Sequence, residues 1–99
     1  MDAYVLDALM PDLVGHDHRP SAFVVYLLLW RRTGGGLRKV GLSHRMIADG
    51  TGLSLRSVQP ALRLLHRRQL IEVARKTPTS VPIFTLRCHW RTRGKPRAD

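Results

Sequence analysis

The spacing of apolar and polar positions predicts a run of short helices followed by a β-hairpin. Residues 22–30 are apolar on every face, which is typical of a helix buried most of the way round. We expect this helix to begin at Pro20, with Ser21 as its cap, and to run to Arg32. Three glycines at 34–36 end it, and residues 37–42 then form an extended piece long enough for one short strand.

Residues 43–68 contain the signature of two capped helices. Ser43 is a good N-cap for a helix of about eight residues, on which Met46 and Ile47 are expected to face inward. Ser54 caps a second helix that runs to about Arg68, with an apolar stripe at helical spacing formed by Leu55, Val58, Leu62 and Leu65. Between the helices, Gly52 permits the positive φ that a tight turn requires. This arrangement predicts a helix-turn-helix.

The remaining segments predict a hairpin and two terminal extensions. Residues 70–76 and 83–86 are expected to form two strands joined by a turn at 77–80. Residues 2–14 have the spacing of a short amphipathic helix, interrupted by Pro11 and closed by Gly15. We therefore expect a mainly α fold with a small β-hairpin, divided into an acidic helical extension (1–19), the folded domain (20–87) and a basic tail (88–99).

The charge of the chain narrows the class of partner. The 99 residues include 17 Lys and Arg against 7 Asp and Glu, a formal net charge of +10. Residues 1–20 are net acidic, whereas residues 21–99 hold 16 basic and 3 acidic side chains. So dense a basic excess attracts polyanions, of which nucleic acid is the commonest and an anionic membrane the next.

Other classes of function have little support in the sequence. The longest apolar run is nine residues, whereas a membrane-spanning helix needs about 20, so we expect no membrane partner. The single Cys88 excludes an internal disulfide and fits the reducing cytosol, which indicates a cytoplasmic protein. The pairs His16/His18 and Cys88/His89 lack the spacing of a zinc site, so no metal and no cofactor are expected. No catalytic constellation and no signal for a small-molecule effector are evident, and we expect no enzymatic activity.

Two motifs resemble those of the winged helix-turn-helix superfamily of bacterial DNA-binding proteins, in its GntR-like and replication-protein-like branches. They are IADGTGLSLRSV at residues 47–58 and ALRLLHRRQLIEV at residues 61–73. The resemblance implies a three-helix core, a short strand and a two-stranded wing within residues 20–87. It also implies that the helix at about 54–68 enters the major groove, while the wing at about 74–82 touches the backbone or the minor groove.

The residue types on these elements suit contacts with duplex DNA. Hydrogen-bonding side chains remain on the outer face of the second helix, where Arg can read guanine and Gln adenine: Ser54, Arg56, Ser57, Gln59 and Arg63. Ser43 and Arg45 stand at the start of the first helix, where phosphate contact is natural. By resemblance, the wing positions are Arg75, Lys76 and Thr79, together with Thr77 and Ser80.

The interpretation that follows is a small transcriptional regulator that binds double-stranded DNA sequence-specifically. The alternative is a winged-helix interaction module that binds protein or RNA, or the DNA-recognition piece of a replication or mobile-element protein. A lone domain of this size makes few contacts with DNA, so a homodimer through residues 4–14 is also expected, with Leu6, Leu9, Met10 and Leu13 as the contact residues.

Two residues depart from the family pattern. Gln69 stands where the family usually has Gly, so it must adopt a left-handed backbone at a cost of about 1 kcal/mol, or the helix must end differently. Pro60 lies inside the second helix, where it removes the hydrogen bond to the carbonyl of Arg56. We expect a kink near residues 56–59 as a result.

Overall fold

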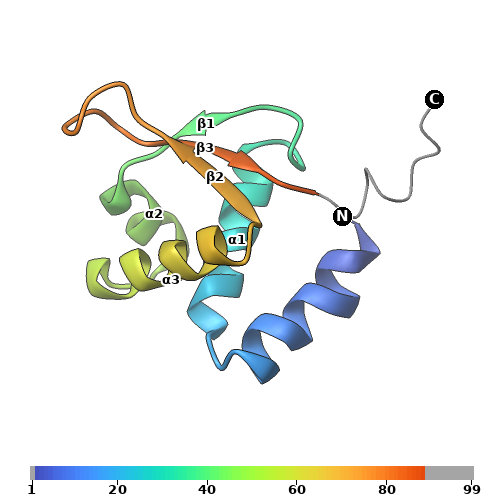
Figure 1. Cartoon of the computed structure of the whole chain (residues 1–99). Helices are drawn as coiled ribbons and strands as arrows, with labels where there is room; N and C mark the ends of the chain where they lie inside the picture. The colour runs from blue at the N-terminus through green and yellow to red at the C-terminus, as the bar shows by residue number, and fades with distance from the viewer. Residues whose placement is uncertain (1, 89–99) are drawn as a thin grey trace, which may run out of the picture.

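The computed structural model describes residues 2–88 and shows a mainly helical chain with a three-stranded antiparallel sheet (Figure 1). The mainly α expectation is therefore confirmed. Two N-terminal helical stretches, η1 and η2, precede three α-helices and three short strands. In chain order the elements are η1 (Val5–Leu9), η2 (Pro11–His16), α1 (Pro20–Arg32), β1 (Val40–Gly41), α2 (His44–Thr51), α3 (Leu55–Arg67), β2 (Ile71–Ala74) and β3 (Ile83–Leu86).

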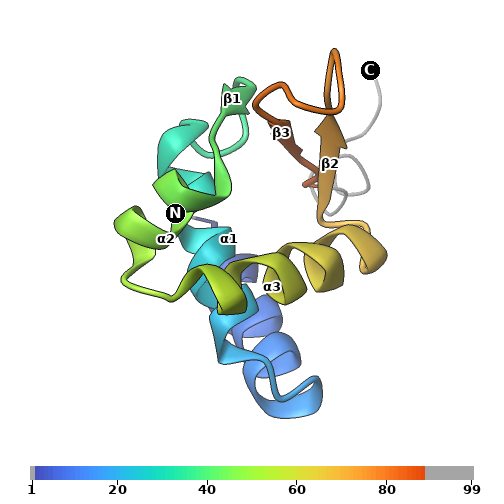
Figure 2. The same cartoon turned by 90° about the vertical axis from the view of Figure 1, so that its left-hand side faces the viewer.

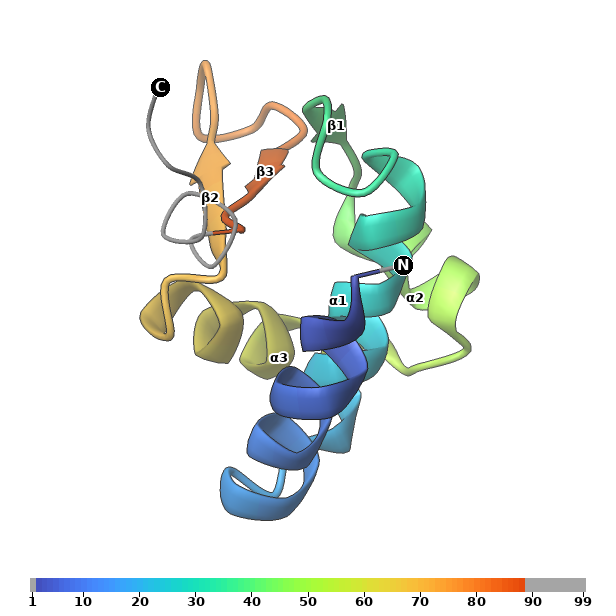
Figure 3. The same cartoon turned by 90° about the vertical axis from the view of Figure 1, so that its right-hand side faces the viewer.

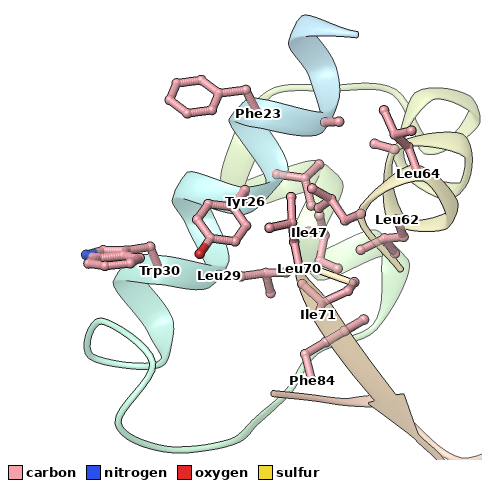
Figure 4. Packing of buried hydrophobic residues seen from close by; sticks show 14 of the residues in the cluster. Phe23, Tyr26, Leu29, Trp30, Ile47, Leu62, Leu64, Leu70, Ile71 and Phe84 are labelled. Atoms are coloured by element: carbon pink, nitrogen blue, oxygen red, sulfur yellow. The ribbon is translucent and has the colours of Figure 1, made fainter. Parts of the chain in front are cut away.

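Helix α1 is the centre of the core. Its bounds agree with the prediction, and Tyr26 and Leu29 are fully buried among residues of α2, α3 and the sheet (Figure 4). The predicted cap is wrong, because Arg19 occupies the N-cap position and no side chain caps the helix. Pro20 is itself the first helical residue and fixes the φ that starts the helix, so Ser21 lies inside the first turn.

Helices α2 and α3 begin where the sequence predicts, after Ser43 and Ser54. Two side chains expected in the core are exposed instead, Met46 by 47% and Leu55 by 44%. Met46 lies about 100° around the helix from the fully buried Ile47, because an α-helix has 3.6 residues per turn. Leu55 is the first residue of α3 and lies at its open end, before the buried stripe begins.

Helix α3 contains Pro60 in its interior and is followed by Gln69, the two residues that depart from the expected pattern. The helix runs unbroken from Leu55 to Arg67 with Pro60 as its sixth residue, so the kink expected at 56–59 does not divide it. Beyond its end, Gln69 has φ of 60°, so of the two outcomes that the sequence leaves open here the structure has the left-handed backbone. The amide of Leu70 donates to the carbonyl of Leu65 at 2.9 Å across this residue and closes the last turn.

The sheet has the strand order β1-β3-β2, with both pairs antiparallel. Val40 of β1 and Val73 of β2 flank Phe84 on the central strand, and Phe84 is 1% exposed. Strand β2 is shorter than the predicted 70–76, because the chain leaves the ladder after Ala74 and enters a loop. Ile71 and Phe84 connect the sheet to the helical core (Figure 4).

The second half of the N-terminal segment (residues 5–16), η2, packs against α1 (Figure 3). The backbone of this segment makes wider turns than an α-helix, since the amide of Met10 donates to the carbonyl of Val5, and it continues past Gly15 to His16. Leu9 and Leu13 are buried against the domain, which corrects their assignment to a dimer contact, whereas Leu6 and Met10 are exposed. The basic tail expected at 88–99 lies outside the described residues, apart from the half-buried Cys88.

Candidate functional site

The turn between α2 and α3 is held by local hydrogen bonds. The Thr51 hydroxyl donates to the carbonyl of Ile47 at 2.7 Å and accepts from the amide of Leu53 at 3.2 Å. Gly52 follows α2 with φ of 82°, a backbone conformation that favours glycine, as the sequence predicts. These contacts fix the direction in which α3 leaves α2.

The predicted serines cap the two helices with their hydroxyls. The Ser43 Oγ accepts a hydrogen bond from the amide of Met46 at 3.1 Å. The Ser54 Oγ accepts from the amide of Ser57 at 3.2 Å and donates to its hydroxyl at 3.1 Å. In this arrangement Ser43 and Ser54 position the first turns of α2 and α3, and the amide groups of those turns point out of the helix ends.

One face of α3 carries a row of exposed polar side chains. Their positions are separated by three or four residues, so they lie above one another on the helix: Arg56, Gln59, Arg63 and Arg67. The opposite face contains Val58, Ala61 and Leu65, which are fully buried. Packing of this apolar face against α1 therefore fixes which side chains α3 presents to solvent.

An open cavity of about 540 Å³ lies between α3, the sheet and the start of α2. We call it the α3–sheet cavity. Its polar lining consists of His44, Gln59, Arg63, His66 and Arg67. Its apolar wall consists of Leu62, Val73 and Phe84, and Figure 4 shows Leu62 and Phe84 approaching from α3 and β3. No acidic side chain is among the residues that line it.

The cavity brings together only part of the predicted site. Gln59 and Arg63 line it, whereas Ser54, Arg56 and Ser57 lie nearer the start of α3. Ser43 and Arg45 are at the start of α2, and Arg45 is exposed. Of the predicted α3 residues, Ser54, Arg56, Gln59 and Arg63 are exposed, whereas Ser57 is half-buried.

The predicted wing residues Arg75, Lys76 and Thr79 lie in the β2–β3 loop, at the end of β2 away from α3 (Figure 2). The Ser80 hydroxyl organises this loop, because it accepts from the amides of Lys76 and Thr77, both at 3.1 Å. The Arg75 guanidinium donates to the carbonyl of Ser80 at 3.1 Å and so folds against its own loop. All three predicted side chains are exposed.

Sequence reasoning missed His44, His66 and Arg67 as residues of the cavity. His66 and Arg67 follow Gln59 by seven and eight positions, so helical spacing alone could have placed them on the same face. No sequence signal indicates His44, because its place in the lining depends on how α2 packs beside the sheet.

Arg68, next to the cavity residue Arg67, is held by the N-terminal segment. Its guanidinium donates to Asp12 at 2.7 Å and also to Asp17. The hydrogen bond with Asp12, with the charges of both carboxylates, raises the pKa of Arg68. A hydrogen bond with His16 and the positive charge of Arg68 lower the pKa of Asp17, against the opposing effect of burial.

Three of the acidic side chains near α3 are engaged in ion pairs with arginines outside the cavity. Arg68 pairs with both Asp12 and Asp17 and balances one of their two negative charges, and Glu72 on β2 pairs with Arg87 at 3.1 Å. The cavity arginines Arg63 and Arg67 have no such pair among the described ion pairs. The exposed face of α3 is therefore an uncompensated cationic surface.

Two further kinds of site are not found in the described part of the chain. Residues 2–88 contain no group of three or more His, Cys, Asp or Glu side chains that could hold a metal ion. None of the helices over the same range is long and apolar enough to cross a membrane.

Comparison with protein-family models, curated proteins and solved structures finds no match to this chain.

Proposed function

We propose that the chain is a winged helix-turn-helix protein that binds double-stranded DNA sequence-specifically, as a small cytoplasmic transcriptional regulator. The observation that carries the proposal is the exposed, uncompensated row of Arg56, Gln59, Arg63 and Arg67 on one face of α3. An α-helix fits the width of the major groove, where Arg pairs with guanine and Gln with adenine. In this proposal α3 is the helix that reads bases.

The other predicted residues have supporting roles in this proposal. The amide groups at the start of α2, held by the Ser43 cap, suit a DNA phosphate, and the exposed Arg45 stands beside them. The β2–β3 loop is the wing, with Arg75, Lys76 and Thr79 on the backbone or in the minor groove. Phosphate contacts of this kind fix the position of the protein on the duplex and carry no sequence information.

The homodimer belongs to the same proposal, with a smaller contact surface than the sequence indicates. Leu6, Met10 and Val14 are 47%, 41% and 37% exposed and recur every four residues on the N-terminal segment. In the dimer, this stripe would pack against the same stripe of a second copy related by a two-fold axis. Two α3 helices would then reach the two half-sites of one DNA site. Size-exclusion chromatography with light scattering tests the dimer, because the double variant Leu6→Ser/Met10→Ser should be a monomer.

The experiment that tests DNA binding is fluorescence anisotropy with a labelled random duplex over a series of salt concentrations. Each phosphate contact contributes about −0.9 to the slope of log K against log salt. We therefore expect Arg45→Ala and Arg75→Ala each to make the slope shallower by about 0.9. Arg19→Ala is the matched control, because it removes the same charge from an exposed position outside α2, α3 and the sheet.

Two results would contradict this proposal. The absence of binding at low salt would exclude double-stranded DNA as the partner. Equal affinity for duplex RNA would instead favour the alternative, an interaction module for RNA or protein, because duplex RNA has a major groove too narrow for α3.

A further inference from the structure

The proposed contact with DNA uses the polar side chains around the α3–sheet cavity but gives no role to its apolar wall. Leu62 and Phe84 form this wall with Val73, which is 39% exposed on β2. Contact of the outer face of α3 with the major groove does not need a cavity of about 540 Å³ beside that helix. That volume lies within the range of about 300–1,000 Å³ that is typical of small-molecule sites.

The chemistry of the lining specifies the kind of molecule that fits. Arg63 and Arg67 are permanently charged, and a guanidinium binds a carboxylate through two parallel hydrogen bonds. His44 and His66 add ring nitrogens that can donate hydrogen bonds. No lining residue is acidic, so the cavity contains no charge of its own that would balance the arginines.

From these observations we propose that the α3–sheet cavity binds a small organic anion with an apolar body, such as an aromatic or medium-chain carboxylate. The carboxylate lies between Arg63 and Arg67, and the apolar body covers Val73 and Leu62. The positive charge excludes cationic ligands, and the apolar wall gives small hydrated anions such as acetate little to bind.

Such a ligand has a direct consequence for the proposed function. Gln59 and Arg63 line the cavity and also belong to the row assigned to base reading. A bound carboxylate neutralises this surface and occupies the space beside α3, so ligand and DNA exclude each other. This consequence rests on the proposed function, whereas binding of the ligand itself does not.

The test is a titration of the ¹⁵N-labelled chain with naphthalene-2-carboxylate, followed by amide chemical shifts. Naphthalene-2-carboxamide is the matched neutral probe, and acetate is the anion without an apolar body. We expect saturable shifts at α3 and β2 with the naphthalene carboxylate. The carboxamide should bind at least tenfold more weakly because it lacks the charged hydrogen bonds to the guanidinium groups. Acetate should bind at least tenfold more weakly because it has no apolar body to cover Val73 and Leu62. Shifts outside the cavity, or equal binding of the carboxamide, would overturn the proposal.

Three variants separate the two parts of the site. Arg67→Gln should weaken binding of the carboxylate roughly tenfold, because it removes the charge but keeps an exposed polar side chain. Val73→Thr should weaken it severalfold, since threonine keeps the shape and the strand preference of valine but adds a hydroxyl. Arg19→Gln, outside the cavity, should change nothing. Equal affinity of all three variants would contradict the site.

The same probe separates this inference from the proposed function. Added naphthalene-2-carboxylate should release a labelled duplex from the wild-type chain but much less from Arg67→Gln. Ligand binding without any DNA binding leaves the cavity assignment intact and removes only the competition. DNA binding without any ligand binding overturns the cavity assignment alone.

Discussion

Replacement of Gln69 by glycine should stabilise the protein, although the substitution removes a whole side chain. Gln69 follows α3 with φ of 60°, and its amide donates to the carbonyl of His66 at 2.9 Å. The next amide, that of Leu70, reaches the carbonyl of Leu65 at the same distance. The bond from the Leu70 amide requires the left-handed backbone at position 69.

The size of the effect follows from two opposing terms. A side chain in the left-handed region costs about 1–2 kcal/mol, which glycine does not incur. Glycine loses about 0.5–1 kcal/mol more backbone entropy on folding than alanine does. The Gln69 side chain is exposed, so its removal sacrifices little packing. The net gain is about 0.5–1 kcal/mol, which corresponds to a rise in Tm of about 2–8 °C for a domain of this size.

Thermal unfolding followed by circular dichroism measures this gain, with Gln69→Ala as the control. Alanine removes the same polar atoms but keeps the Cβ, so its Tm should stay within about 2 °C of the wild type. The reasoning is refuted if the glycine variant is no more stable than the alanine variant, because the left-handed backbone would then carry no cost.

Three further predictions concern the supports of α3. Ser54→Ala should lower the free energy of unfolding by about 1 kcal/mol in urea titrations, whereas Ser54→Asp, which can still cap the helix, should not. Pro60→Ala should raise that free energy by about 1–3 kcal/mol, since it restores one backbone hydrogen bond inside α3; a lower value would indicate that the ring is needed for packing. Asp17 has a folded-state pKa below its ordinary value of 3.8, so its contribution to stability is complete above that pH and is lost as the pH falls through the folded pKa. Urea titrations between pH 5 and pH 2 should therefore show a shallower loss for Asp17→Asn than for the wild type, and identical slopes would show that Asp17 does not stabilise the fold.

Helix starts and the central strand could be predicted from sequence because local chemistry determines them. Ser43 and Ser54 cap their helices with their own hydroxyls, and Gly52 has the positive φ of a tight turn. The strand at 83–86 has the predicted bounds because its apolar residues form a short run that follows the turn residues at 77–80. At Gln69 the sequence allows either a left-handed backbone or a different helix end, and the structure has the first.

Features that depend on tertiary packing could not be predicted. The contact of Arg68 with Asp12 joins residues 56 positions apart, and nothing in either local sequence indicates it. His44 lines the α3–sheet cavity only because α2 starts beside the sheet. Similarly, Leu9 and Leu6 are equally apolar, and only tertiary packing determines that one is buried and the other exposed.

The most direct test of the central claim is selection of bound sequences from a random duplex pool. For the wild-type chain we expect an enriched motif that contains guanine and adenine positions read by Arg63 and Gln59. Gln59→Ala should lose its preference at the adenine position alone, by about 1–3 kcal/mol of discrimination, and Arg19→Ala should select the wild-type motif. A pool without any enriched motif, or the same motif from Gln59→Ala and Arg63→Ala, would contradict base reading by α3.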